Sequence, residues 1–198
     1  MTDRKPGPDD RGDGPLGAVA FIARVRDTYV DQFQAFAEHN LAEGVEGASE
    51  IKLELDRSDR IFKRLYCADF MMATDDGYEP IQFHAETQIC FEPFEARIGA
   101  IDVAFASFGW DGIDIRFDSA LGPEQILDDW HDYWFDPDDE RRDRDALLNG
   151  NIHNVVIVPG GVSIDMGTAP AEAFWDLLEA FDAAGVTRLE IGGDEDMP

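Results

Sequence analysis

The sequence predicts an α+β domain, in which a mainly antiparallel sheet is joined by a long N-terminal helix, a mid-chain helical block and a C-terminal β-α-β unit. Three observations support this class. Apolar residues recur with a helical period near the N-terminus, they alternate with polar residues between positions 51 and 118, and the last fifty residues have a strand, helix and strand pattern. The chain has 198 residues, 44% of them hydrophobic. A chain of this length buries roughly 70% of its unfolded surface, so it needs neither disulfides nor a metal ion to fold.

One domain between two short tails is expected. Residues 1–15 are rich in Pro, Gly and Asp and are expected to form a disordered arm, residues 16–193 a single α+β domain, and residues 194–198 an acidic tail. The N-terminus has no apolar segment of a signal peptide, and no stretch approaches the ~18 apolar residues of a membrane span. A cytoplasmic location without membrane contact is therefore expected.

A long helix is predicted at the start of the domain. Ile22, Tyr29 and Phe33 lie on one face of a helix with 3.6 residues per turn. This face is expected to pack into the core. Gly44 ends the helix, which is predicted over residues 18–43.

Strands are predicted in the next part of the chain. Residues 51–55, 62–74 and 81–91 are rich in β-branched and aromatic residues and partly alternate between apolar and polar ones. In the third of these segments, His84 and Glu86 lie on the polar face. This alternation is typical of a strand with one face in water.

A hairpin is predicted at Asp111-Gly112, because both positions of a two-residue type I′ turn need a positive φ angle. The strands on either side would place small and large apolar residues opposite each other. The predicted pairs are Trp110 with Ile113, Phe108 with Ile115, and Ala106 with Phe117.

The mid-chain helical block begins at Pro123, which suits the first turn of a helix. Trp130 and Trp134 belong to its apolar face, and His131 is expected on the opposite, acidic face together with several Asp residues. A second short helix is predicted over residues 138–149.

The C-terminal part is predicted to be a hairpin followed by a helix and a last strand. Residues 154–158 and 162–166 form the hairpin, and residues 169–184 the helix, with Thr168 as its N-terminal cap. The last strand is predicted over residues 186–191. If the strands before and after the helix join one sheet, they are expected to be parallel.

The charge of the chain is strongly negative. It contains 43 acidic and 16 basic residues, for a net charge of −27, of which −21 falls within residues 67–193. This charge argues against nucleic-acid binding, which depends on cationic contacts to phosphates. Cys67 and Cys90 are expected to be reduced, buried thiols.

The main functional hypothesis is a non-catalytic acidic protein that engages a basic partner protein, as an inhibitor or immunity factor does. We expect one continuous acidic patch on its surface, and homodimerisation through strand 187–191 is left open. The residues predicted to bind the partner are Asp128, Asp129, Asp132, Asp136, Asp138, Asp139 and Glu140.

Two alternatives remain. A metal-assisted hydrolase would bind its metal through Asp128, His131 and Asp132, which share a helix face at i, i+3 and i+4. A second candidate for acid–base catalysis is the polar pair His84 and Glu86, with His153 and Asp165 nearby. Without such a role, the acids would form a hydrated surface of a housekeeping domain in a salt-adapted host. The sequence lacks the HExxH, CxxC, P-loop and dinucleotide-binding motifs, so no cofactor is predicted.

Overall fold

The computed structural model describes residues 15–42, 46–57, 60–143 and 145–192. The predicted arm, apart from Pro15, and the predicted acidic tail lie outside these residues. The described residues form three α-helices, nine strands and one short 3-10 helix. These are α1 Pro15–Ala42, β1 Gly47–Glu54, η1 Phe62–Arg64, β2 Leu65–Thr74, β3 Gly77–Ile81, β4 Phe94–Ile98, β5 Ile101–Phe105, β6 Ile113–Phe117, α2 Pro123–Phe135, β7 Asn154–Val158, β8 Gly161–Asp165, α3 Ala171–Ala183 and β9 Arg188–Ile191.

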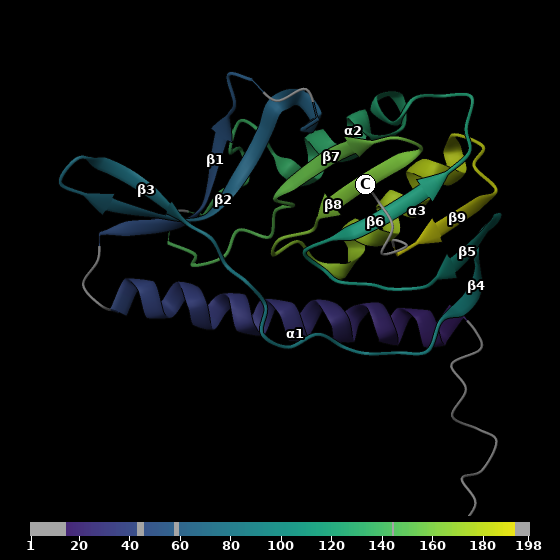
Figure 1. Cartoon of the computed structure of the whole chain (residues 1–198), viewed down its shortest axis with the longest axis horizontal. Helices are drawn as coiled ribbons and strands as arrows, with labels where there is room; N and C mark the ends of the chain where they lie inside the picture. The colour runs from purple at the N-terminus through teal and green to yellow at the C-terminus, as the bar shows by residue number, and fades with distance from the viewer. Residues whose placement is uncertain (1–14, 43–45, 58–59, 144, 193–198) are drawn as a thin grey trace, which may run out of the picture.

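The strands form two sheets, one of order β1-β2-β3 and one of order β4-β5-β9-β6-β8-β7 (Figure 1). Among the described strand pairs, β5 and β9 pair in parallel and all others are antiparallel. β6 lies between β8 and β9 and is antiparallel to both, so these two strands run parallel, as expected for the β8-α3-β9 unit. The predicted α+β class is confirmed.

Helix α1 extends along both sheets (Figure 1). Phe36 of α1 contacts Phe70 of the three-stranded sheet, with ring centroids 6.4 Å apart. Nearer the start of the helix, Phe21 contacts Phe94 of the six-stranded sheet at 5.5 Å. One hydrophobic cluster therefore includes residues from α1 and from both sheets.

Helices α2 and α3 pack against each other beside the six-stranded sheet. The Trp130 indole of α2 donates a hydrogen bond of 2.8 Å to the Ala173 carbonyl of α3. Phe181 of α3 packs on Phe117 of β6, with centroids 4.8 Å apart. The predicted start of α2 at Pro123 is confirmed, and so is the predicted β7–β8 hairpin.

The prediction of a strand over residues 81–91 is wrong, because Ile81 is the only one of these residues that belongs to a strand, β3. The segment that follows packs its apolar side chains on α1; Phe83 lies 5.3 Å from Phe33. Side chains take some of its backbone hydrogen bonds: Gln32 accepts from the N–H of Thr87 at 2.9 Å. The apolar residues of this alternating segment face a helix, and the segment does not pair with a strand.

The hairpin predicted at Asp111-Gly112 is also wrong in its pairing. Strands β5 and β6 are not neighbours, because β9 lies between them. The turn is closed by a single bridge between Gly109 and Gly112. Beyond β5, the N–H of Ala106 bonds to the Ile191 carbonyl of β9 at 2.8 Å, so a strand from the far end of the chain takes the place of the predicted partner.

Three local predictions need correction. Residues 138–143 and 145–149 form turns, bends and irregular backbone instead of the predicted helix. Asp136, with a φ of 53°, is the C-cap of α2. Thr168 does not cap α3, whose N-cap is Pro170. Cys67 is buried as predicted, but Cys90 is exposed, because its segment is not a strand of the core.

Within the residues that the structure describes, no helix combines the length and the apolar composition that crossing a bilayer requires.

Candidate functional site

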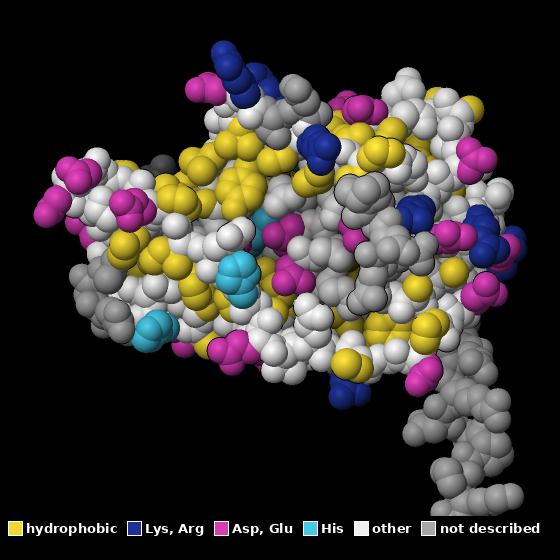
Figure 2. All heavy atoms as spheres, in the orientation of Figure 1, with side chains coloured by type: hydrophobic (Ala, Val, Ile, Leu, Met, Phe, Trp, Pro, Cys, Tyr) yellow, Lys and Arg dark blue, Asp and Glu magenta, His cyan; other side chains and the backbone are white. Residues whose placement is uncertain are grey.

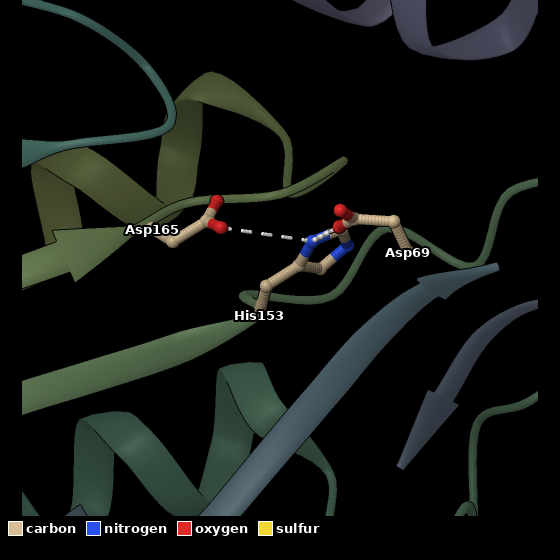
Figure 3. Close-up of side chains that lie close together, drawn as sticks. All are labelled: Asp69, His153 and Asp165. Carbon is tan, nitrogen blue, oxygen red and sulfur yellow. Dashed lines mark ion pairs between the residues drawn. The ribbon is translucent and has the colours of Figure 1, made fainter. Parts of the chain in front are cut away.

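The strongest candidate site lies where the two sheets meet, around His153. His153 directly precedes β7, Asp165 is the last residue of β8, and Asp69 belongs to β2 of the other sheet. Figure 3 shows the two carboxylates approaching the imidazole from different sides. One ligand atom from each of the three side chains lies within 4.8 Å of the others.

The backbone brings these residues together. The β7–β8 hairpin pairs Asn154 with Asp165, and the N–H of His153 bonds to the Asp165 carbonyl at 2.9 Å. The carbonyl of His153 in turn accepts a hydrogen bond of 2.8 Å from the N–H of Cys67 in β2. This bond joins the two sheets beside the site.

Nδ1 of His153 faces both carboxylates. It lies 3.0 Å from Oδ1 of Asp69 and 3.9 Å from Oδ2 of Asp165. The imidazole is fully buried, whereas the side chains of Asp69 and Asp165 are 10% and 21% exposed, so the cluster reaches solvent on the carboxylate side. Within the described part of the chain, Nδ1 has no partner with hydrogen-bond geometry.

The other polar atom of each side chain is already engaged. Oδ2 of Asp69 accepts a hydrogen bond of 2.8 Å from the N–H of Phe83, and Oδ1 of Asp165 accepts one of 2.9 Å from the N–H of Gly167. Nε2 of His153 lies 3.3 Å from Oε1 of the fully buried Glu50. Each of the three cluster side chains is thus held from outside and leaves one atom pointing inward.

Glu50 is held in a strained backbone conformation. Its φ of 52° lies in the left-handed region, which costs a non-glycine residue about 1–2 kcal/mol. Ser49 and Ile51 pair with Phe70 and Ala68, so Glu50 faces Asp69 across the two strands. Its carboxylate accepts hydrogen bonds from the Thr168 hydroxyl and the Asn149 N–H. Strain of this kind is often found at functional sites.

The imidazole also fits tightly among apolar groups. Phe33 of α1 contacts it edge-on, with ring centroids 5.4 Å apart. On another side lies Gly167, whose φ is 49°. A Cβ atom at this position would lie 2.1 Å from Cδ2 of His153, so only glycine leaves room for the ring.

The cluster carries more negative than positive charge. Within the part of the chain that the structure describes, His153 is the ion-pair partner of all three acids of the cluster, and these acids have no other ion pair. They are Glu50, Asp69 and Asp165. Burial by itself lowers the pKa of His153, but nearby groups outweigh it and raise that pKa well above its ordinary value. In order of effect these groups are Cys67, which acts only when it is ionised, and then Asp165, Asp69 and Glu50. Because burial raises the pKa of the Cys67 thiol to about 12, that thiol is neutral at pH 7, and the carboxylates favour a positive charge on the ring.

The acidic residues predicted to bind a partner are largely paired with lysine and arginine of the same chain. Lys63 lies 2.7 Å from Asp128 and 2.5 Å from Asp132. Lys52 lies 3.6 Å from Asp136 and 2.6 Å from Asp139. Four of the seven predicted partner-binding residues therefore contact a cation. The remaining three, Asp129, Asp138 and Glu140, are exposed.

On the face drawn in Figure 2, acidic side chains are scattered, and lysine and arginine lie among them. This face does not show the single continuous acidic patch that we expected. Several acids of the chain are also paired with a lysine or arginine, as Lys63, Arg64 and Arg97 show.

His131 contacts Asp132, with Nδ1 3.7 Å from Oδ1, but its side chain is buried, whereas those of Asp128 and Asp132 are about half exposed. The imidazole is fully buried between Phe62 and Phe135, with centroids 4.9 and 5.0 Å away. Within the described residues, neither ring nitrogen has a hydrogen-bond partner. Lys63 lies between the two carboxylates, so these contacts favour an ion-pair role over metal ligation for this helix.

Of the second predicted set, His153 and Asp165 do lie together, whereas His84 and Glu86 are exposed on the segment after β3. Sequence reasoning missed Asp69 and Glu50. Asp69 had a signal, because it is a lone acid inside the apolar run of β2. A charged group in a buried strand needs a partner.

No protein-family model, curated protein or solved structure matches this chain. The interpretation of the site therefore depends on its geometry alone.

Proposed function

We propose that this protein binds one divalent transition-metal ion through Nδ1 of His153 and the inward carboxylate oxygens of Asp69 and Asp165. The observation that carries the proposal is the fully buried Nδ1 atom, which faces two carboxylate oxygens at 3.0 and 3.9 Å. A neutral ring that donates from Nε2 to Glu50 has a lone pair on Nδ1. That lone pair would face two anionic oxygens, so a cation must separate them: either a proton or a metal ion.

The distances suit a metal ion. Bonds of about 2.1 Å, typical of zinc with nitrogen and oxygen ligands, separate tetrahedral ligand atoms by about 3.4 Å. The separations of 3.0 and 3.9 Å from Nδ1 lie on either side of this value. All three ligand atoms lie within 4.8 Å of one another, so the side chains would have to rotate toward the ion to ligate it together.

The surrounding hydrogen bonds also support the proposal. A histidine that ligates a metal usually donates its other N–H to a carboxylate or carbonyl, which fixes the ring and raises its basicity. Glu50 stands in that position. The Phe83 and Gly167 N–H groups hold the two aspartates in the same way. A divalent ion would also balance the surplus negative charge of the cluster.

The ligand set suggests what such an ion would do. Three protein ligands leave one position for water, as in hydrolytic metal centres, whereas structural zinc sites are usually closed by four. A bound ion lowers the pKa of such a water toward neutrality. The metal-assisted hydrolase hypothesis thus moves from Asp128, His131 and Asp132 to Asp69, His153 and Asp165. The partly exposed Asp165 gives this site contact with solvent.

Calorimetric titration of the chelator-treated protein with Zn²⁺, and Co²⁺ absorption spectroscopy, test the proposal. We expect one ion per chain, loss of binding in Asp69→Asn and Asp165→Asn, and a Co²⁺ spectrum typical of nitrogen and oxygen ligands. The matched control is the double variant Asp128→Asn, Asp132→Asn, which removes two carboxylates from α2 and is expected to bind as the wild type does.

Two outcomes would overturn the proposal. If the wild-type protein takes up no ion while its fold is intact by circular dichroism, a proton holds the site and His153 is a structural imidazolium. If the α2 double variant loses binding and the two single variants keep it, the metal binds on α2.

A further inference from the structure

A groove between α2 and α3 has the features of a docking surface, and it lies apart from the His153 cluster. We call it the α2–α3 groove; it encloses about 1040 Å³, including space open to solvent. Trp130 and Trp134 of α2 and Ala180 of α3 are among the residues that form its floor.

The groove exposes apolar surface. The side chains of Leu121 and Tyr133, both in its lining, are 41% and 57% exposed. Ala180, Ala183 and Ala184 line the opposite side, where short side chains leave the space open. Contiguous exposed apolar surface with a polar rim is characteristic of interaction sites.

The rim of the groove is acidic. Asp129 comes from α2, and Asp176 and Glu179 come from α3. Among the described residues, none of these three forms an ion pair, and no lysine, arginine or histidine lines the groove. Asp176 accepts a hydrogen bond of 3.2 Å from the Trp134 indole. Asp128 and Asp132 of α2 and the C-cap residue Asp136 differ, since they already contact cations.

We infer that the α2–α3 groove binds a cationic amphipathic segment of a basic partner protein. Apolar side chains of the segment would pack on Leu121, Tyr133 and the alanines, and its lysines or arginines would reach the three carboxylates. Aromatic rings add attraction for such cations. Arg141 already lies over the Tyr133 ring at 4.4 Å, and its charge is shared with Asp136. Of the residues predicted from the sequence to bind a partner, this surface contains Asp129. It also contains Asp176 and Glu179, which were not predicted.

The charge of the chain decides between a basic partner and a second copy. A homodimer through this groove would bring two acidic rims together on chains that each carry −27. Like charges in one interface lower the affinity, whereas a basic segment is attracted before contact. We therefore assign the groove to a basic partner.

The experiment uses the full chain and a designed fluorescent peptide, an 18-residue helix with Leu and Trp on one face and Lys on the other. Fluorescence anisotropy at low salt measures its affinity. Asp129→Asn with Glu179→Gln is expected to weaken binding about tenfold, because two rim charges are lost. Tyr133→Ala is expected to weaken it by a similar factor without unfolding, since this side chain is mostly exposed.

The matched control is Asp75→Asn with Asp76→Asn, two exposed acids in the β2–β3 turn, which changes the net charge equally. It is expected to alter the affinity less than twofold. The inference is overturned if the control weakens binding as much as the groove variant, or if a peptide with Glu for Lys binds equally well. It is also overturned if light scattering detects a dimer that Tyr133→Ala dissociates, because a second copy then fills the groove.

Discussion

The sharpest prediction concerns Gly167→Ala. A Cβ at this position would lie 2.1 Å from Cδ2 and 2.4 Å from Nε2 of His153. Carbon atoms in contact are about 3.5–4.0 Å apart, so the imidazole must move by at least about 1.4 Å. A metal site tolerates displacements of about 0.5 Å. The variant is therefore expected to lose metal binding while the rest of the fold persists.

Its effect on stability has two parts. The φ of 49° places an alanine in the left-handed region, which costs about 1–2 kcal/mol. Overpacking against the buried ring adds about 1–3 kcal/mol. The free energy of unfolding should thus fall by about 2–5 kcal/mol.

Gly185→Ala is the control that separates the two parts. Its φ of 77° is also left-handed, but nothing lies within 4 Å of a Cβ placed there. It should lose only the backbone part, about 1–2 kcal/mol. Urea unfolding followed by circular dichroism measures both variants, and Zn²⁺ titration follows. Equal destabilisation of the two, or wild-type Zn²⁺ affinity in folded Gly167→Ala, would refute the steric argument.

Three further predictions concern stability. Burial lowers the pKa of His131 from 6.5 to about 4. The unfolded chain therefore binds the proton at a higher pH than the folded chain does. The contribution of His131 to the free energy of unfolding is fully present above pH 6.5, and about 3 kcal/mol of it is lost as the pH falls to 4. His131→Phe removes that part of the pH dependence, and denaturant unfolding at pH 7 and pH 4.5 should detect a smaller difference than in the wild type; an unchanged difference would contradict the reasoning. Gly161→Ala should cost at least about 2 kcal/mol in urea unfolding, because its Cβ would lie 2.0 Å from the Ile115 carbonyl oxygen and no rotamer relieves a backbone clash. Raising NaCl from 0.05 to 0.5 M should raise Tm, since screening weakens repulsion within a chain of net charge −27; a flat Tm would rule out self-repulsion as a cost to this fold.

Local sequence patterns were sufficient to predict the elements that depend on residues close together in the chain. The helical period predicted α1 over 18–43, and the structure has it at Pro15–Ala42. The helix predicted over 169–184 is α3 at Ala171–Ala183, and Gly185 follows it with a left-handed φ. The β7–β8 hairpin was predicted because its two strands are joined by a short turn. In each case the interacting residues are near in sequence, so periodicity and turn chemistry decide the outcome.

The errors came from apolar faces whose partner is distant in the chain. Residues 81–91 alternate like a strand, yet their apolar side packs on α1. The segment before Gly112 was paired with β6, yet β9 occupies that place. Alternation of apolar and polar residues indicates that one side of a segment is buried. It does not indicate which element covers that side, because helix and sheet surfaces both bury apolar residues.

The sequence by itself determined the α+β class, the acidic charge and the hairpin of residues 154–158 and 162–166, whereas the contact of His153 with Asp165 at the end of that hairpin is a finding of the structure. Only the tertiary structure brought Asp69 and Glu50 to the same imidazole, because they lie on a different sheet, with Glu50 103 positions from His153. Only the structure also placed Lys63 between Asp128 and Asp132 and buried His131 among aromatic rings. The physical reason is that an ion pair or a ligand cluster depends on distances in space, and the packing of α1, α2 and the two sheets sets those distances.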